Sequence, residues 1–211
     1  MNEIKITENI SYLKANSEPL SADIGIIKTK DVTWLYDVGN GIKNIEGLDD
    51  TYNVVISHFH LDHIGNLNNI KINKLYVSKE SYRHLPKEVI ANCAVIIVNE
   101  DLYFDNLHIF PLPSSHSKGS LGLEIDNRYA FIGDAAYCKT KNGSCSYNVQ
   151  ILKAEITVLE NLNANKLLLS HLDGLIYDKT KLIAKLEKIY DTRIPKQSEI
   201  ILNNTDLFLE N

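Results

Sequence analysis

Hydrophobic positions recur along this chain in short bursts between polar turns, a pattern that predicts many short β-strands. Residues 3–13 and 21–37 alternate or run apolar around a turn at 16–19, which predicts antiparallel strands at the start of the chain. The next run, 52–56, is continuous and rich in β-branched residues, as in a strand that is buried on both faces. Further strands are expected at 74–78, 94–98, 107–110, 121–125, 129–132 and 166–170, and 200–202 with 207–209 are expected to close the chain.

Two segments in the last third of the chain instead have the helical period. Residues 148–162 carry apolar side chains at helical spacing, at Val149, Leu152, Ile156, Leu159 and Leu162. Asp178 is placed to cap a second helix that carries Leu182 and Leu186. Taken alone, these periods predict a mixed α and β protein and nothing more specific.

Length and charge narrow the class of protein. A chain of 211 residues is long enough for one domain with a full core, so we expect a single domain over residues 1–211. The formal net charge of -5 argues against a nucleic-acid-binding surface, which is normally basic. The first residues lack the regions of a signal peptide, and no apolar stretch approaches about 18 residues, so we expect a cytoplasmic protein without membrane contact. The cysteines at 93, 138 and 145 lack zinc-finger spacing, and we expect reduced thiols.

Three histidines and an aspartate fall within six positions directly after the strand expected at 52–56. They are His58, His60, Asp62 and His63. Asp62 is placed to cap a short helix that begins at His63, so the group occupies a strand-to-helix turn. Because the backbone curls around a point at such a turn, His58 and His60 can reach one ion. Asp62 and His63 then face a second ion beside it. Imidazole and carboxylate are the ligands that zinc and comparable metals take in catalytic sites, so the group predicts a metal site more strongly than a histidine-rich surface loop.

The pattern His-x-His-x-Asp-His resembles that of the metallo-β-lactamase superfamily, and the family's remaining ligands have counterparts downstream in the same order. Its third histidine corresponds to His116, where Ser115 replaces the usual preceding glycine. Its bridging aspartate corresponds to Asp134, which follows Phe-Ile-Gly, and its last histidine corresponds to His171. An earlier Asp-x-Gly hallmark corresponds to Asp37, which either forms a turn with its own backbone or orients a metal ligand.

The resemblance covers about residues 20–175 and implies both a fold and a ligand set. The fold is the α+β four-layer αββα sandwich, in which two mixed β-sheets pack together with helices on their outer faces and the ligands gather at one edge. The cofactors implied are two Zn²⁺ ions per chain, with iron or manganese as alternatives. By this resemblance His58, His60 and His116 hold the first ion, Asp62, His63 and His171 hold the second, and Asp134 bridges them.

The chemistry that this centre implies is hydrolysis. Two adjacent ions lower the pKa of a shared water, which supplies a metal-bound hydroxide as nucleophile. Asp62 is expected to orient this hydroxide and to accept its proton. Tyr137, three residues after Asp134, stands where a tyrosine of the quorum-quenching lactonases in this superfamily contacts the substrate carbonyl. Its phenol is expected either to donate a hydrogen bond to the developing oxyanion or to line the wall of the pocket.

A polar loop over the same edge is expected next in the chain. Lys139 and Lys141 either attract an anionic tail of the substrate or are simply solvated. Cys138 is expected to be a packed or free thiol. His84 and His108 match no motif of the family and are expected to be ordinary exposed or core-edge residues.

We interpret the chain as a metal-dependent hydrolase of a small molecule that contains an ester, thioester or lactone bond. Glyoxalase II-like and lactonase-like enzymes are the most similar by motif, whereas a classical β-lactamase would be expected to carry a signal peptide. One alternative is a mononuclear iron enzyme of the persulfide dioxygenase type, which has a similar motif. Another is a non-catalytic binding module, although none of the seven ligands is missing. Substrate identity and oligomeric state stay open, because fold alone does not determine function.

Overall fold

Two large mixed β-sheets, one in each of two units of the chain, carry the fold. The computed structural model describes residues 3–202, and the chain divides into the units Met1–Leu102 and Tyr103–Asn211. The mixed α and β class expected from the sequence is confirmed. The expectation of a single domain over residues 1–211 stays a prediction, and the apolar segment 207–209 lies outside the described residues.

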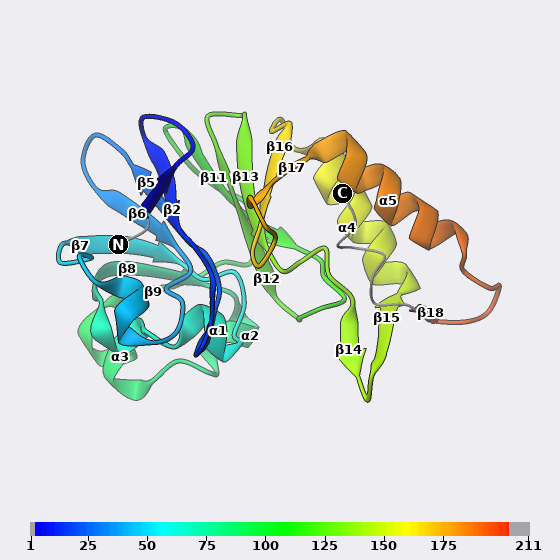
Figure 1. Ribbon diagram of the computed structural model, residues 1–211, viewed down its shortest axis with the longest axis horizontal. Helices are drawn as coiled ribbons and strands as arrows, with labels where there is room; N and C mark the ends of the chain where they lie inside the picture. The colour runs from blue at the N-terminus through cyan, green and yellow to red at the C-terminus, as the bar shows by residue number, and fades with distance from the viewer. Residues whose placement is uncertain (1–2, 203–211) are drawn as a thin grey trace. The chain divides into compact units, whose positions relative to one another are not determined.

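The sheet of the N-terminal unit has seven strands in the order β1-β2-β5-β6-β7-β8-β9 (Figure 1). Neighbours from β1 to β6 are antiparallel, as the alternating sequence predicts, and neighbours from β6 to β9 are parallel. The strands are β1 (Glu3–Lys5), β2 (Ile10–Leu13), β5 (Ile24–Lys28), β6 (Thr33–Tyr36), β7 (Thr51–Val55), β8 (Lys71–Val77) and β9 (Ala94–Ile97). A small hairpin, β3 (Asn16–Ser17) and β4 (Leu20–Ser21), stands apart from this sheet.

Short helices follow the parallel strands of this unit and pack on the sheet. They are η1 (Ile42–Ile45), α1 (Leu61–Ile64), η2 (Leu67–Asn69), α2 (Lys79–Tyr82) and α3 (Lys87–Asn92). Leu35, Val54 and Leu75, from three neighbouring strands, are completely buried in one cluster with Val89 of α3. This core fixes the ends of the parallel strands, and the histidine-rich motif follows the end of β7.

The sheet of the C-terminal unit has six strands in the order β10-β11-β12-β13-β16-β17. They are β10 (Leu102–Phe104), β11 (Leu107–Leu112), β12 (Ser120–Ile125), β13 (Tyr129–Gly133), β16 (Lys166–Leu169) and β17 (Ile176–Asp178). The pair β13–β16 is parallel, so both strands deliver the chain to the same edge of the sheet. A second, three-stranded sheet consists of β14 (Lys139–Lys141), β15 (Ser144–Asn148) and β18 (Glu199–Leu202).

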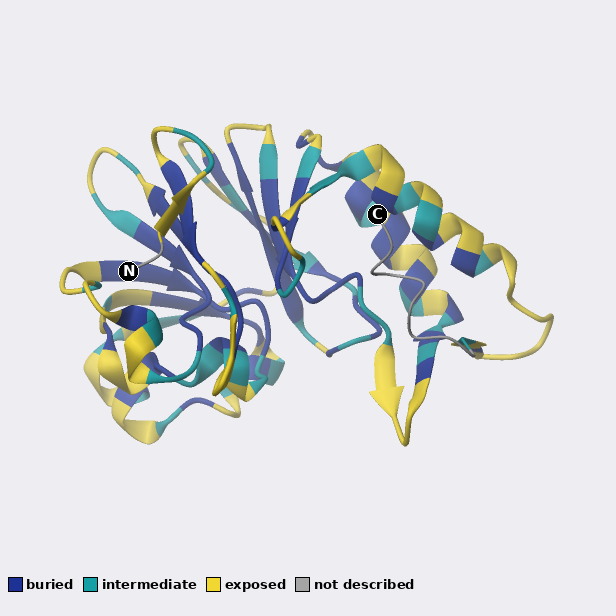
Figure 2. Ribbon diagram, viewed as in Figure 1, coloured by how far each residue is buried: buried dark blue, intermediate teal, exposed yellow. Residues whose placement is uncertain are grey.

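Two long helices, α4 (Val149–Asn161) and α5 (Lys179–Asp191), pack against each other and against the six-stranded sheet. Each buries one stripe and exposes the opposite face (Figure 2). Asn148 caps α4 through the amides of Gln150 and Ile151, and Asp178 caps α5 through the amide of Lys181. The two helices expected from the apolar spacing are therefore confirmed, including the cap at Asp178.

The hairpin formed by β14 and β15 contradicts two expectations. Residues 139–141 form a strand where a polar loop was predicted, because they pair with Ser144 to Ser146 across a tight turn at Asn142 and Gly143. The expectation of reduced thiols is wrong for Cys138 and Cys145, which form a disulfide, while Cys93 is a free thiol. Spacing alone could not reveal this bond, because the hairpin is what brings the two Cα atoms to 5.5 Å.

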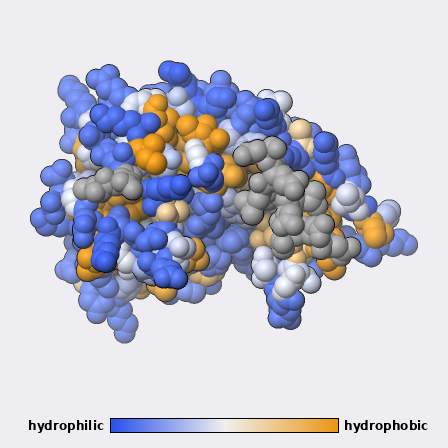
Figure 3. All heavy atoms as spheres, viewed as in Figure 1, coloured by the Kyte–Doolittle hydropathy of each residue, from blue (hydrophilic) through white to orange (hydrophobic). Residues whose placement is uncertain are grey.

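The visible surface is mostly hydrophilic (Figure 3), consistent with a chain in which 23% of residues are charged. Within residues 3–202, every helix is too short or too polar to cross a membrane.

Candidate metal centre

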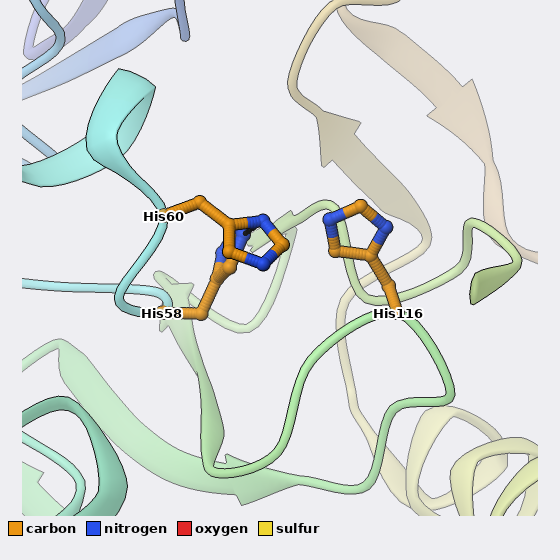
Figure 4. Close-up of side chains that lie close together, drawn as sticks. All are labelled: His58, His60 and His116. Carbon is orange, nitrogen blue, oxygen red and sulfur yellow. Dashed lines mark hydrogen bonds between the residues drawn. The ribbon is translucent and has the colours of Figure 1, made fainter. Parts of the chain in front are cut away.

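The histidine-rich motif of the N-terminal unit lies where the parallel strand β7 ends. His58 and His60 project from the loop between β7 and α1, with 2.9 Å between His58 Nε2 and His60 Nδ1 (Figure 4). Both rings therefore turn a nitrogen toward the same point. Asp62 and His63 follow within α1, where Asp62 Oδ2 lies 3.4 Å from His63 Nε2. As expected, His58 lies next to His60 and Asp62 lies next to His63.

The local structure of α1 corrects one expectation. The helix begins at Leu61 with His60 as N-cap, and Asp62 lies in its first turn instead of capping it. The amides of His63 and Ile64 both donate to the His60 carbonyl. The helix therefore begins at Leu61 and not at His63, where the capping preference of aspartate had placed its start. The Asp62 carboxylate does not cap the helix and faces His63 instead.

A buried carboxylate behind the motif orients two of its histidines. Asp37 is completely buried, and its Oδ2 lies 2.7 Å from His63 Nδ1. The same carboxylate accepts hydrogen bonds from the amide and the hydroxyl of Ser57, each at 2.7 Å. Because the Ser57 hydroxyl donates its hydrogen bond to Asp37, its oxygen accepts a hydrogen bond from His58 Nδ1 at 3.0 Å. Asp37 and Ser57 thus leave the Nε2 atoms of His58 and His63 as the atoms that can bind a metal.

The sequence assigned no role to Ser57, and it left Asp37 between two roles. Asp37 has a φ of 60°, and its carboxylate contacts Ser57 and His63 rather than its own backbone. Its hydrogen bond to His63 supports the orienting role. A signal for Ser57 existed in the sequence, since a hydroxyl between a buried strand and a metal-binding histidine is well placed to contact both.

The C-terminal unit brings together the other three expected ligands, each in the segment that follows a strand of the six-stranded sheet. His116 lies in the loop after β11 (Figure 4), Asp134 directly follows β13, and His171 follows β16. Asp134 is 5% exposed, and its Oδ2 lies 3.5 Å from His116 Nε2 and 3.7 Å from His171 Nε2. One carboxylate oxygen therefore faces two imidazoles, as a bridging ligand would.

Backbone carbonyl groups fix the loops that carry these candidate residues. His116 Nδ1 lies 3.3 Å from the carbonyl oxygen of Cys138, which can only accept, so His116 donates from Nδ1 and keeps Nε2 for a metal. Tyr137 donates its hydroxyl hydrogen to the carbonyl oxygen of Ser170 at 2.7 Å, one residue before His171. The hydroxyl of Ser114 donates to the carbonyl of Ala135 and accepts from the amide of His116.

The other residues considered from the sequence are not among the side chains that either unit groups with the expected ligands. Lys139 and Lys141 are exposed on β14. His84 stacks on Phe59 at 4.2 Å between ring centroids, and His108 lies 3.2 Å from a carboxylate oxygen of Glu124. These contacts agree with ordinary structural roles for both histidines.

The family model of the beta-lactamase superfamily domain matches residues 41–176, more than half of the chain. No curated protein sequence matches.

Solved structures are similar over most of their length. One is a B3 metallo-β-lactamase with an active-site glutamic acid, at 12% identity, covering 92% of this chain and 90% of that chain, with a TM-score of 0.64. Another is an archaeal metallo-β-lactamase superfamily protein from Sulfolobus tokodaii, at 16% identity over 89% and 88% of the two chains, with a TM-score of 0.57. A third is a chemotaxis sensor solved as a peroxy diiron species, at 16% identity over 88% and 94%, with a TM-score of 0.64. At such identities the likeness shows a shared fold.

Proposed function

Because this chain belongs to the metallo-β-lactamase superfamily, we propose that it is a metal-dependent hydrolase that cleaves an ester, thioester or lactone bond in a small molecule. The metals proposed are two zinc ions. The ligands are those of the family pattern, with His58, His60 and His116 for the first ion, Asp62, His63 and His171 for the second, and Asp134 for both.

The observation that supports this proposal most directly is the orientation of three imidazoles. Nδ1 of His58, His63 and His116 is in each case engaged by an oxygen from the surrounding structure. A histidine whose Nδ1–H is held in this way has its Nε2 lone pair available, which is the usual arrangement of a metal-binding histidine and its supporting partner. His108, outside the ligand set, has a similar partner in Glu124, so this orientation supports the proposal together with the grouping of the proposed ligands within each unit.

The chemical donor set also fits the proposed metal. Five neutral imidazoles and two carboxylates carry a formal charge of about -2, which suits a pair of divalent cations better than a soft ion that prefers thiolates. When bound, two zinc ions supply an activated water at neutral pH and polarise the scissile carbonyl.

Two residues of the chain are proposed to act on the substrate or on its water. The Asp62 side chain is partly exposed, at 15%, and next to His63, so one of its oxygens can accept the proton of the attacking water. Tyr137 is proposed to donate a hydrogen bond to the developing oxyanion. A phenol has only one proton, however, and Tyr137 gives it to Ser170, so that bond must break for the proposed role.

The first experiment is elemental analysis of the full chain purified without added metal or chelator. We expect about two zinc ions per chain, together with hydrolysis of members of an ester, thioester and lactone panel. His116→Ala should lower the metal content and abolish hydrolysis, whereas His84→Asn, at an exposed histidine outside the ligand set, should change neither.

Other outcomes decide against the proposal. One iron per chain with oxygen consumption on a persulfide substrate would favour the dioxygenase alternative. Absence of bound metal after both zinc and iron were offered would overturn the seven-ligand assignment and leave a non-catalytic binding module as the better hypothesis.

A further inference from the structure

The disulfide between Cys138 and Cys145 lies at the base of the β14–β15 hairpin, four residues after the proposed ligand Asp134. We propose that this disulfide is a reversible redox site, addressed by a dithiol reductant, whose reduction weakens metal binding through His116. The inference rests on the proposed function to the extent that His116 is a metal ligand. It adds a modification site to the C-terminal unit and assigns the hairpin a role.

The link to the metal ligand is one hydrogen bond long. The carbonyl oxygen of Cys138 is the acceptor for His116 Nδ1, at 3.3 Å. Any movement of the backbone at Cys138 therefore changes the partner that holds the His116 ring. A hydrogen bond from Nδ1 keeps the ring oriented so that Nε2 can bind a metal. The position of the Cys138 carbonyl therefore affects how tightly His116 can bind the metal.

The other end of the disulfide is attached to the core. Cys145 is 3% exposed and belongs to the hydrophobic cluster beneath α4 and α5. Its strand β15 pairs with β18, and the neighbouring Tyr147 donates its hydroxyl hydrogen to the carbonyl of Ala136. The amide of Asn148, where β15 ends, donates to the hydroxyl of Ser115, beside His116. The disulfide thus ties a segment that contacts a ligand to a strand that is fixed in place.

Without the disulfide, Cys138 would be held far less firmly. The strand β14 that follows it is exposed at all three residues. Within residues 3–202 it lies at the edge of its sheet, paired with β15. That pairing comprises only Lys139 with Ser146, Thr140 with Cys145 and Lys141 with Ser144. Short edge hairpins are marginally stable by themselves, so the covalent bond adds a restraint on the Cys138 backbone that the hairpin pairs alone do not supply.

The two sulfur atoms differ in exposure to solvent, which determines the sulfur that a reductant can attack. Cys138 is half-buried, with its Sγ 3.8 Å from the hydroxyl of Thr140 on the exposed strand, whereas Cys145 is buried. A thiolate of the reductant would attack Cys138 Sγ, forming a mixed disulfide and releasing Cys145 as a thiolate that takes up a proton. The second thiol of the reductant then attacks the reductant sulfur that is bonded to Cys138, which closes the reductant's own disulfide and releases Cys138 as a thiolate that takes up a proton. The protein gains two electrons and two protons, and the dithiol becomes a disulfide.

A reversible bond also accounts for a disulfide in a chain with few cysteines. Only one such pair is present among three cysteines, so the chain lacks the dense framework of small secreted domains. The sequence predicts a cytoplasmic protein, and disulfides outside oxidising compartments are usually transient and serve catalysis or redox sensing.

The test compares zinc affinity in two redox states of the full chain. Wild-type protein would be prepared oxidised, and also reduced with a phosphine that is removed by anaerobic desalting. Thiol alkylation and mass spectrometry would verify the state of Cys138 and Cys145. Zinc alone is then titrated in competition with a chromogenic chelator. We expect the reduced protein to bind zinc about tenfold more weakly or worse, since loss of a ligand's supporting partner typically costs about 10- to 100-fold in affinity.

Two variants make the result specific. The Cys138→Ser/Cys145→Ser double variant should bind zinc as weakly as reduced wild type and should not respond to the reductant. Cys93→Ser, at the free cysteine of the N-terminal unit, should behave as wild type in both states. If the double variant is unfolded by circular dichroism, reduced wild type carries the comparison.

Three outcomes would overturn the inference. Equal zinc affinity in two verified redox states would remove the link to His116 and leave the proposed metal site intact. Failure of the folded protein to be reduced would remove the reversibility. Absence of zinc binding in both states would overturn the proposed metal site itself and the redox link with it.

Discussion

Asp37 holds His63 through a 2.7 Å contact between Oδ2 and Nδ1, and both side chains are completely buried. The two residues are 26 positions apart in the sequence and meet because β6 and β7 are parallel neighbours. The same carboxylate accepts from Ser57, which in turn contacts His58. One buried acid thereby supports a histidine from each proposed metal position.

Asp37→Asn should weaken zinc binding while leaving the fold intact. Asparagine keeps the size of the side chain and tolerates the positive φ at this position. A neutral amide, however, is a poorer acceptor for the imidazole of His63 and for the amide and hydroxyl of Ser57. We expect a loss of about 10- to 100-fold in zinc affinity, measured by chelator competition. Asp126→Asn is a matched control, because Asp126 also has a positive φ but lies in an exposed turn of the C-terminal unit. An unchanged affinity in the Asp37 variant would show that the charge of this acid does not support zinc binding.

Tyr137→Phe separates a catalytic role from a positioning role. If the phenol stabilises the oxyanion, kcat should fall by about 100-fold with metal content intact, as for loss of one preorganised donor. If its role is the hydrogen bond to Ser170, the variant should lose metal at the His171 position, and kcat per bound metal should be preserved. We expect the first result; metal analysis and kcat on the same preparation decide between them.

Glu155 is a source of instability whose size depends on pH. This residue of α4 is completely buried, neither carboxylate oxygen has a hydrogen-bond partner among the described residues, and burial raises its pKa well above the usual value. A carboxyl group with a raised folded-state pKa binds its proton more tightly when the protein is folded. Glu155 therefore destabilises the folded protein least at acidic pH. Its destabilising contribution grows as the pH rises above the pKa of the unfolded carboxyl, and it stops growing once the pH is above the folded-state pKa.

Glu155→Leu should remove this dependence and stabilise the protein by about 1–3 kcal/mol near pH 8, the usual cost of an unsatisfied buried polar group. Urea unfolding at pH 5 and pH 8 measures both effects, with the larger gain expected at pH 8. Glu160→Gln, at an exposed position of the same helix, should leave stability nearly unchanged. A destabilised Glu155→Leu protein at pH 8 would mean that the carboxylate has a buried partner such as water.

Gly122 is required by a close ring contact in the C-terminal sheet. It pairs with Phe110 across β11 and β12, and a Cβ atom at this position would overlap the Phe110 ring. Gly122→Ala should therefore destabilise the protein by about 1–3 kcal/mol through overpacking. The same substitution in a Phe110→Leu background should cost less, because the overlapping ring is gone. Equal costs in both backgrounds, measured by thermal or urea unfolding, would contradict the overlap.

The sequence by itself determined the local features of this protein. The apolar spacing of residues 148–162 and the capping preference of Asp178 specified α4 and the start of α5, because helical period and caps depend on neighbours within a few residues. The clustered His58, His60, Asp62 and His63 predicted a metal site for the same reason, since a single turn brings them together. Asp134, His116 and His171 could be named only by their likeness to a family pattern.

Only the tertiary structure decided which distant residues support those ligands. Asp37 reaches His63 across parallel strands, the carbonyl of Cys138 reaches His116 from another loop, and Cys138 meets Cys145 because a hairpin folds between them. The burial of Glu155 likewise follows from how α4 packs, not from its own polarity. Such contacts depend on strand order and packing, which the periodicity of a single chain does not encode. Hydrogen bonding and burial therefore had to be read from the folded protein.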